Sequence, residues 1–371
     1  MAKIKTAIGL MSGTSMDGID VALLRTDGVR HIEFGPTQSF AFSADETQAI
    51  AAGLEAAKHI AQRTDRPGEL AQLENAVTLS HAAAVTGFLN ANGLDAENID
   101  AIGFHGQTVL HRPEKALTVQ LGDGAMLAEK TGIDVVWDMR ANDIANGGQG
   151  APLVPVFHDA LASVKGMASP VGFVNIGGIA NVTFVLGDGD PIAFDCGPGN
   201  ALIDQWVQAK TNQSFDDGGA LGLRGTVHAG LLERYLLDSF FEQTAPKSLD
   251  RNDFTLQMPA DISAEDGAAT LAELTAVGIV KAQATAGVRP KRWVVSGGGA
   301  RNGAIIQSLQ RQLPDADVKT ADQVGLDANM MEAQCWAYLA VRCMRGLALT
   351  YPTTTGCVEA CTGGIISHPS G

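Results

Sequence analysis

The sequence predicts an α/β protein built from two similar lobes that face each other across a cleft. A unit of strand, Gly-rich loop, strand, turn and strand occurs near the start of the chain and recurs after residue 170. Helical and strand patterns alternate between and after the two copies, and polar or Gly-rich clusters follow strand ends, where open α/β sheets bind ligands. At 371 residues, the chain also exceeds what one hydrophobic core usually supports.

The first copy begins with an apolar run at residues 4–10, followed by the loop SGTSMDG and a second run at 19–24. A turn at Asp27 and Gly28 leads to a third run at 31–34. The loop is no P-loop, because it lacks the lysine after the glycine and leads into a strand instead of a helix. Its glycines would let backbone N–H groups approach an anion, and the alternative is a structural turn rich in Ser and Gly.

The second copy repeats this order between residues 171 and 194. An apolar run leads to Gly177 and Gly178, a strand pattern follows at 182–186, and the turn GDGD precedes the third strand. That strand ends in FDCGPGN, where the chain must turn before the helical pattern that follows residue 200. Two opposed glycine loops suit a polyphosphate, so each lobe is expected to offer one loop to such a ligand.

The remaining segments extend the α/β pattern. Residues 69–89 carry a helical stripe, and IDAIGFHGQT, TVQLG and IDVVWDMR each predict a strand that ends in a polar loop. Near the C-terminus, KRWVVSGGGARN predicts a buried strand, a triple glycine against which a base or ribose could lie, and then a helix at 304–313.

Composition excludes several classes of partner. The formal net charge of -15 and a pI near 4.9 disfavour nucleic acid and anionic membranes. The N-terminus is not expected to be a signal peptide, and no apolar run is long enough to span a bilayer. The cysteine usage is typical of a protein of the reducing cytoplasm, which is the expected location. The five cysteines lack C-x-x-C spacing, which argues against a zinc site or a disulfide framework, and the histidines read as exposed loop residues.

Six motifs occur together in one order: GLMSGTSMDGID, GFHGQTVLH, DMRANDIANGGQGAPLVP, VNIGGIANVT, FDCGPGN and SGGGARN. In this combination the chain closely resembles the anhydro-N-acetylmuramic acid kinases, over nearly its whole length. That family belongs to the sugar kinase, Hsp70 and actin superfamily. The resemblance implies a two-lobed actin-like (ribonuclease H-like) ATPase fold, with a duplicated mixed-sheet core around a central cleft.

The resemblance implies that ATP, Mg2+ and water convert 1,6-anhydro-N-acetylmuramic acid into N-acetylmuramic acid 6-phosphate during peptidoglycan recycling. It also implies a homodimer. We expect residues 1–135 and 353–371 to form the first lobe, and residues 136–352 the second. The residues expected to bind the nucleotide are Ser12, Gly13, Thr14, Ser15, Met16, Asp17, Gly18 and Ile19 in the first loop, Gly177 and Gly178 in the second, and Gly297, Gly298 and Gly299 at the nucleoside.

Asp195 resembles the catalytic base of the family, and the alternative is a carboxylate that caps the following helix. Cys196 beside it is expected to be a buried structural residue. Asp17 could hold Mg2+ directly or through water, or could simply be a solvated turn residue.

Four residues are candidates for contacts with the sugar. Arg140 could bind the lactyl carboxylate, or could instead pair with Asp138 or Asp143. The others are His105, Gln107 and Glu332, the last of which could instead be a solvated helical residue. Two other functions remain open at this point: a simple sugar kinase without hydrolysis, and a nucleotide-binding regulator without kinase activity.

Overall fold

The computed structural model describes residues 3–13, 15–249 and 253–370 and divides the chain into two compact units. The first unit comprises Met1–Val164 and Met330–Gly371, and the second comprises Lys165–Asn329. Each unit has its own mixed β-sheet and its own helices, so each buries a separate hydrophobic core.

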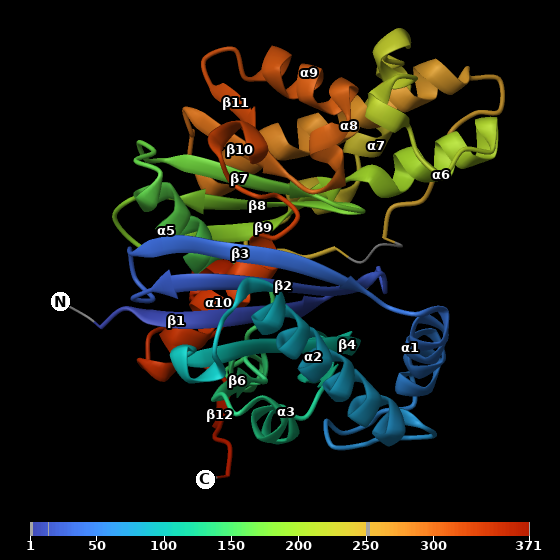
Figure 1. Ribbon diagram of the computed structural model, residues 1–371. Helices are drawn as coiled ribbons and strands as arrows, with labels where there is room; N and C mark the ends of the chain where they lie inside the picture. Colours follow the sequence, from blue (N-terminus) through green and yellow to red (C-terminus); the bar gives the residue numbers. More distant parts are fainter. Residues whose placement is uncertain (1–2, 14, 250–252, 371) are drawn as a thin grey trace. The chain divides into compact units, whose positions relative to one another are not determined.

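The sheet of the first unit is built around an antiparallel meander of three neighbouring strands (Figure 1). On the other side of β1, the strand β4 runs parallel to it, and β6 runs parallel to β4. The edge strand β12 and the outlying β5 pair antiparallel with β6 and β4. The strands are β1 (Lys5–Ser12), β2 (Gly18–Thr26), β3 (Ile32–Ala41), β4 (Ala101–Arg112), β5 (Leu117–Leu121), β6 (Val135–Trp137) and β12 (Ile365–Ser367).

Helices cover both faces of this sheet. The helices α2 (Leu70–Asn92) and α3 (Gly124–Thr131) share one buried cluster with Ile8 and Leu10 of β1. The helix α10 (Met331–Met344) packs against the opposite face. It comes so close that a Cβ atom on Gly9 would lie 1.8 Å from the Ala333 carbonyl oxygen, which only glycine avoids.

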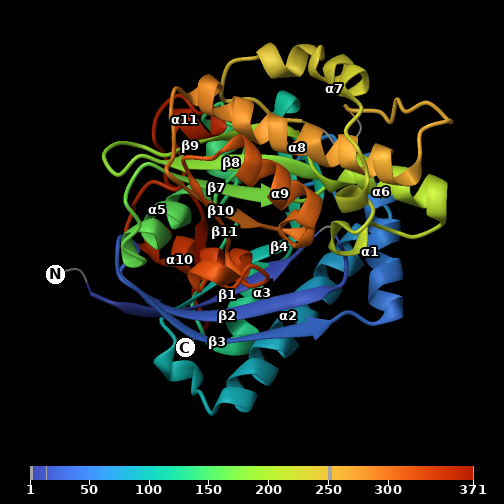
Figure 2. The ribbon, with the colours of Figure 1, turned by 90° about the horizontal axis from the view of Figure 1, so that it is seen from above.

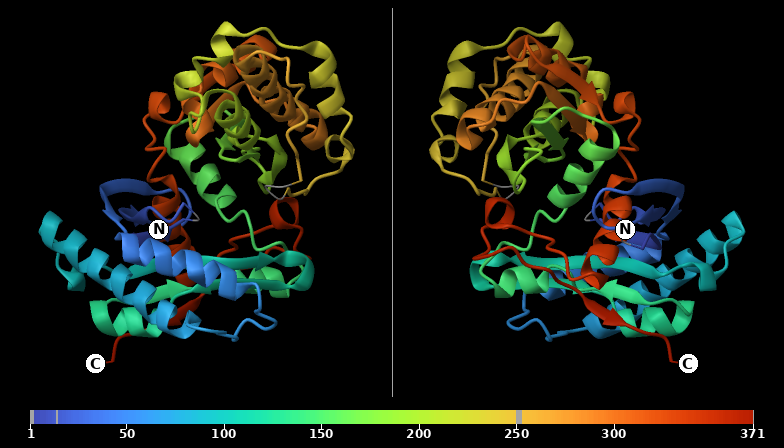
Figure 3. Two further views of the ribbon diagram at one scale, coloured as in Figure 1. Left: turned by 90° about the vertical axis from the view of Figure 1, so that its right-hand side faces the viewer. Right: turned by 90° about the vertical axis from the view of Figure 1, so that its left-hand side faces the viewer.

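Shorter helices and the C-terminal strand complete the first unit. Figure 3 shows the C-terminal strand β12 at the sheet edge beside β6, with the chain ending next to α3. The helix α1 begins with a capping box in which Ser43 and Glu46 bond reciprocally. The remaining helices are α1 (Ala44–Ala57), α4 (Ala141–Ala145), α5 (Pro155–Val164) and α11 (Pro352–Thr355).

The sheet of the second unit repeats the same order on fewer strands. Its antiparallel meander consists of β7, β8 and β9. On the other side of β7, the strand β10 runs parallel to it and β11 runs parallel to β10, as β4 and β6 follow β1 in the first unit. The strands are β7 (Val171–Ile176), β8 (Ile179–Val185), β9 (Ile192–Pro198), β10 (Arg292–Ser296) and β11 (Asp317–Thr320).

The long helix α8 (Ala264–Ala286) is central to the second unit. It packs on β8 and β9 and contacts α6 (Asn200–Thr211), α7 (Ala229–Leu236) and α9 (Gly303–Gln312), as Figure 2 illustrates. A Cβ atom on Gly267 of α8 would lie 2.2 Å from the Trp206 indole ring, so this glycine allows α6 and α8 to pack closely.

The α/β class and the duplicated sheet core are confirmed, including both three-stranded units. The domain boundaries differ from those expected. Residues 136–164 and 330–352 belong to the first unit, because β6 pairs with β4 and β12 and because α10 packs on β1, β2 and β4. These are tertiary contacts between segments far apart in the sequence.

Candidate functional site

The first Gly/Ser loop leaves the end of β1 and is held there by β4. Ser12 is buried and its hydroxyl donates to the Gly106 carbonyl over 3.1 Å. The Gln107 side-chain amide donates to the Gly13 carbonyl over 3.1 Å. Thr14, which was expected to contact phosphate, lies outside the described residues.

The second part of the loop turns into β2. The Ser15 hydroxyl donates to Asp17 Oδ1 over 2.8 Å, and the Asp17 side chain is exposed. Met16 has a φ of 55°, so the backbone is left-handed at this point. Gly18 and Ile19 already belong to β2, where a Cβ atom on Gly18 would lie 2.3 Å from the Phe40 carbonyl oxygen. Close packing against β3 therefore explains why Gly18 lacks a side chain.

A pocket of about 480 Å³ opens beside this loop within the first unit. It brings together three of the four candidate sugar contacts, which come from distant parts of the sequence: His105 on β4, Arg140 just before α4, and Glu332 on α10. The lining residues are Met11, Ser12, Gly13, Ser15, His105, Thr108, His111, Gln120, Arg140, Ala151 and Glu332.

Arg140 is fixed within this pocket by two hydrogen bonds. Its Nη2 donates to His105 Nε2 over 3.2 Å, and its Nη1 donates to the Gly150 carbonyl over 2.8 Å. The Trp336 ring supports both groups, with its centroid 4.7 Å from that of His105 and 5.4 Å from the Arg140 guanidinium carbon. A guanidinium group can only donate, so His105 Nε2 accepts and the proton of the neutral ring lies on Nδ1.

The charges in the pocket follow from burial. Burial, and secondarily Arg140, hold the pKa of His105 well below its usual value, so this histidine is neutral. The surrounding protein raises the pKa of Glu332, an effect that Arg140 opposes. The Glu332 side chain is exposed and lines the pocket, where the charge of Arg140 favours its carboxylate form. The pocket therefore presents a guanidinium cation, a carboxylate and a neutral imidazole.

Several expectations for these residues are corrected by their surroundings. His105 is a buried strand residue and not an exposed loop histidine. Asp138 pairs with Arg63 at 2.5 Å, and Asp143 accepts from the Gly150 N–H, so neither aspartate forms the salt bridge considered for Arg140. Gln107 is fully buried and holds the first loop through Gly13, so its role is structural and not that of a sugar contact.

In the second unit, the loop after β7 is closed by the start of α6. The carbonyl of Gly177 accepts from the Asn200 N–H over 2.8 Å, and that of Gly178 accepts from the Gly199 N–H over 2.9 Å. The nearest atom to a Cβ on Gly177 would be 3.7 Å away, so the side on which a side chain would stand is open. That open space would admit a ligand close to the backbone.

The triple glycine lies directly against this second loop. Gly297 has a φ of 77°, and a Cβ atom there would lie 2.4 Å from Asn175 Oδ1. A Cβ atom on Gly299 would lie 2.3 Å from Ile176 Cγ2, and one on Gly298 would lie 3.4 Å from Asn200 Nδ2. The structure thus brings together the two glycine clusters that the sequence predicted for the second lobe.

Asp195 lies on β9 and is only partly exposed. Its Oδ2 accepts from the Leu249 N–H over 2.8 Å, and its own N–H donates to the Lys247 carbonyl over 3.0 Å. Burial raises the pKa of Asp195 to about 6, against the opposing effect of the Leu249 N–H. The N-cap of α6 is Gly199 with no side-chain cap, so the helix-capping alternative for Asp195 is wrong. Its neighbour Cys196 is buried and donates to the Ala180 carbonyl.

Sequence reasoning missed the polar residues beside Arg140 and His105. The Gln120 amide donates to Thr108 and Thr118, and Gln120 Oε1 is a buried acceptor without a partner among the described residues. Thr108 in turn lies 3.4 Å from His105 Nε2. The only signal for these side chains was their place in the strand segments GFHGQT and TVQLG, each of which ends in a polar loop.

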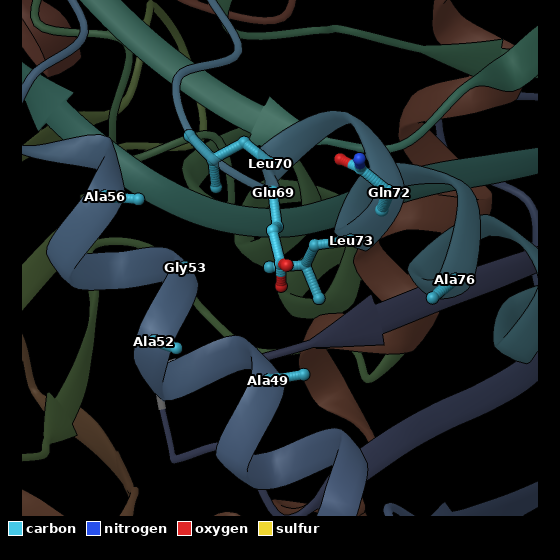
Figure 4. Close-up of a pocket in the computed structure, with 9 residues that line it drawn as sticks. All are labelled: Ala49, Ala52, Gly53, Ala56, Glu69, Leu70, Gln72, Leu73 and Ala76. Carbon is cyan, nitrogen blue, oxygen red and sulfur yellow. The ribbon is translucent and has the colours of Figure 1, made fainter.

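A second pocket of the first unit differs in character. It lies between α1 and α2 and is lined mainly by small apolar side chains, with Glu69 and Gln72 as its polar residues (Figure 4). It holds none of the candidate residues. In the described part of the chain, no helix is long and apolar enough to cross a membrane.

The sequence model of the anhydro-N-acetylmuramic acid kinase family matches residues 5–369. A curated relative with this name from Rhizobium etli is 50% identical to this chain over 370 residues, which cover 100% of both chains. Another, from Brucella canis, is 51% identical over 373 residues and also covers 100% of both chains.

Among solved structures, component A of (R)-2-hydroxyglutaryl-CoA dehydratase from Acidaminococcus fermentans is similar with a TM-score of 0.47 and 13% identity, covering 91% of this chain and 98% of that one. A ROK family glucokinase from Streptomyces griseus, in complex with glucose and AMPPNP, has a TM-score of 0.41 and 16% identity, with coverages of 90% and 98%.

The duplicated mixed sheets define an α/β protein of the actin-like, ribonuclease H-like class. The family's sequence model covers nearly the whole chain, and this match identifies the family. The chain belongs to the anhydro-N-acetylmuramic acid kinases.

Proposed function

We propose that this protein uses ATP and water to open the 1,6-anhydro bond of anhydro-N-acetylmuramic acid and to phosphorylate O6. The product would be N-acetylmuramic acid 6-phosphate, and the setting would be peptidoglycan recycling in the cytoplasm. The observation that carries the proposal is the family match over residues 5–369. The homodimer expected from the resemblance stays a prediction.

The pocket of the first unit contains groups that can bind an acidic amino sugar. Arg140 uses Nη1 and Nη2 to hold Gly150 and His105, and its charge remains available to a substrate carboxylate. Glu332, across the pocket, can accept from sugar hydroxyl groups. His105 orients the guanidinium of Arg140. Because its ring is neutral, His105 does not compete with Arg140 for the substrate carboxylate, as a second cation would.

Asp195 has the properties required of a general base. A carboxylate with a pKa of about 6 is mostly ionised at neutral pH, yet it is a much stronger base than an ordinary aspartate. The Leu249 N–H binds Oδ2, and we assign to Oδ1 the proton taken from water. We assign this water to attack at C1 of the sugar.

Only one carboxylate has a clear role in bond cleavage, whereas inverting glycoside hydrolysis normally requires two. The coupled reaction removes this deficit if the γ-phosphoryl group captures O6 as it departs from C1. Capture neutralises the developing charge on the leaving oxygen, which is otherwise the task of a general acid. Hydrolysis and phosphorylation are then one concerted event, and no second acid is needed.

The glycine-rich segments are assigned to the nucleotide. Backbone N–H groups of the first loop and the open side of Gly177 suit phosphate oxygens, and the cluster at Gly297–Gly299 suits the nucleoside. Asp17 offers an exposed carboxylate beside the Ser15 hydroxyl, and these oxygen ligands fit Mg2+ directly or through water. When bound, Mg2+ would neutralise charge on the phosphates.

The experiment that tests the proposal measures ADP release with Mg-ATP and a panel of amino sugars, both anhydro and open. The expected result is ADP release with 1,6-anhydro-N-acetylmuramic acid and one N-acetylmuramic acid 6-phosphate formed per ADP. Release with open sugars alone would instead identify a simple sugar kinase. Nucleotide binding without ADP release for any sugar would identify a regulator.

A further inference from the structure

Three residues with metal-binding side chains meet inside the first unit, apart from the sugar pocket. Asp143 lies on α4, whereas Cys357 and Cys361 lie in the segment after α11, and all three are buried. One ligand atom from each lies within 4.8 Å of the others. Cys361 Sγ is 3.8 Å from Asp143 Oδ1, and the Thr350 hydroxyl lies 3.1 Å from Cys361 Sγ.

The carboxylate of this cluster is held in a fixed orientation. Asp143 Oδ2 accepts from the Gly150 N–H over 2.6 Å, and Oδ1 accepts from the Thr355 hydroxyl over 2.6 Å. Ligating carboxylates in metal sites are oriented by hydrogen bonds of this kind. The outer contacts of a metal site are therefore already present.

We propose that Asp143, Cys357 and Cys361 bind a thiophilic divalent cation such as Zn2+. Two sulfur ligands and one oxygen ligand suit this ion, and the spacing of the two cysteines falls in the C-x2–4-C range of zinc sites. Zn–S and Zn–O bonds of about 2.3 and 2.1 Å place ligand atoms roughly 3.5–3.8 Å apart in a tetrahedron. The observed separations need to contract by only about 1 Å or less.

Binding exchanges protons for the cation. Each cysteine must lose its S–H proton, so two protons are released when both start as thiols, and Cys361 gives up its hydrogen bond to Asp143. Because bound cysteines are thiolates, the apparent affinity for the cation increases as the pH rises. The Thr350 hydroxyl or a water molecule can supply the fourth ligand.

The cation would also connect this cluster to the sugar pocket. Asp143 holds the N–H of Gly150, and the carbonyl of Gly150 accepts from Arg140. Joining Asp143 to Cys357 and Cys361 would fasten the C-terminal segment to the loop that carries Gly150. The site itself rests on its own three ligands, so it does not depend on the identity of the substrate.

The test is a titration of chelator-treated, reduced full-length protein with Co2+ and then Zn2+. We expect one equivalent of Co2+ to produce thiolate-to-cobalt charge-transfer absorption, which Zn2+ abolishes, and Zn2+ to raise the melting temperature. The double variant Cys357→Ser/Cys361→Ser should lose this absorption, and each single variant should weaken it. The control Cys343→Ser removes another thiol of the same unit, outside the cluster, and should retain it.

Two results would overturn the proposal. One is Co2+ binding without thiolate absorption, which is the spectrum expected from surface histidines or carboxylates. The other is equal absorption in the wild type and in Cys357→Ser/Cys361→Ser. If that double variant does not fold, alkylation of the wild type decides the question. Zn2+ should protect Cys357 and Cys361 more than tenfold over Cys343, and equal labelling with and without Zn2+ contradicts the site.

Discussion

The guanidinium group of Arg140 donates to Nε2 of His105 over 3.2 Å, beside the first Gly/Ser loop. This contact requires a neutral imidazole, and both burial and the charge of Arg140 favour that state. A cation whose orientation is fixed by a neutral partner keeps its charge for a ligand. The contact thus explains how the pocket positions an arginine through a neutral ring and a backbone carbonyl.

The first prediction concerns this arginine. Arg140→Lys should raise KM for the anhydro sugar by about 10- to 100-fold, because an ammonium group cannot hold Gly150 and His105 while making a bidentate contact with a carboxylate. The Kd for ATP should change little. Steady-state kinetics and calorimetry measure the two quantities. Arg63→Lys is the matched control, since Arg63 pairs with Asp138 outside this pocket, and an equal rise of KM in both variants would count against the assignment.

Asp195→Asn separates binding from chemistry. The asparagine can still accept from the Leu249 N–H but cannot take a proton from water, so turnover should fall by about a hundredfold or more. Nucleotide affinity should stay within about twofold of the wild type. Near-normal turnover in this variant would remove Asp195 from the mechanism.

The pH dependence of kcat should report the same carboxylate. Because the base must be ionised, kcat should fall below about pH 6, tenfold per pH unit. His105 should contribute no step near neutrality, since its pKa lies well below the usual value. A profile that is flat from pH 7 to pH 5 would be incompatible with Asp195 as the base.

The raised pKa of Asp195 also predicts a stability change. Between about pH 4 and 6 the folded state binds more protons at Asp195 than the unfolded state, so ionisation destabilises the fold as the pH rises through this window. At pH 7 Asp195→Asn should therefore be more stable than the wild type, by at most about 3 kcal/mol. The difference should vanish below about pH 4. Urea unfolding at both pH values checks the sign, and a variant less stable at pH 7 would refute it.

Two glycines of the second unit should respond differently to alanine. A Cβ atom on Gly177 has no close neighbour, so Gly177→Ala should keep its melting temperature but weaken nucleotide binding by about tenfold, through obstruction of the phosphates. Gly297→Ala places a Cβ atom 2.4 Å from Asn175 Oδ1 at a positive φ and should lower the melting temperature. Thermal unfolding and calorimetry distinguish these cases. Unchanged nucleotide affinity in Gly177→Ala would remove the second loop from the nucleotide site.

Local sequence patterns predicted both meanders, because each combines short apolar runs with glycine turns. They could not predict where the units divide. The position of α10 depends on Gly9 and Gly103, which let the helix approach β1 and β4 closely, and a single glycine in a strand does not reveal its partner. Residues 353–371 were expected in the first lobe, but their strand β12 was not predicted, since it pairs with β6 across more than 220 residues of sequence.

The candidate site could be predicted only in part from the sequence, because its residues come from segments far apart along the chain. His105, Arg140 and Glu332 come from separate segments, and only the resemblance to a family linked them before the structure was known. The sequence argued against a metal site because C-x-x-C spacing is absent. It could not show that Asp143, more than 200 residues away, lies beside Cys357 and Cys361.

The coupled reaction is tested most directly by isotope labelling in 18O-enriched water. The protein is incubated with Mg-ATP and 1,6-anhydro-N-acetylmuramic acid, and the product is analysed by mass spectrometry with fragmentation of the sugar and the phosphate. If Asp195 directs water to C1 while O6 is phosphorylated, one label appears at C1 and none in the phosphate. Label in the phosphate would mean that water attacks phosphorus, and that result would contradict the coupled mechanism.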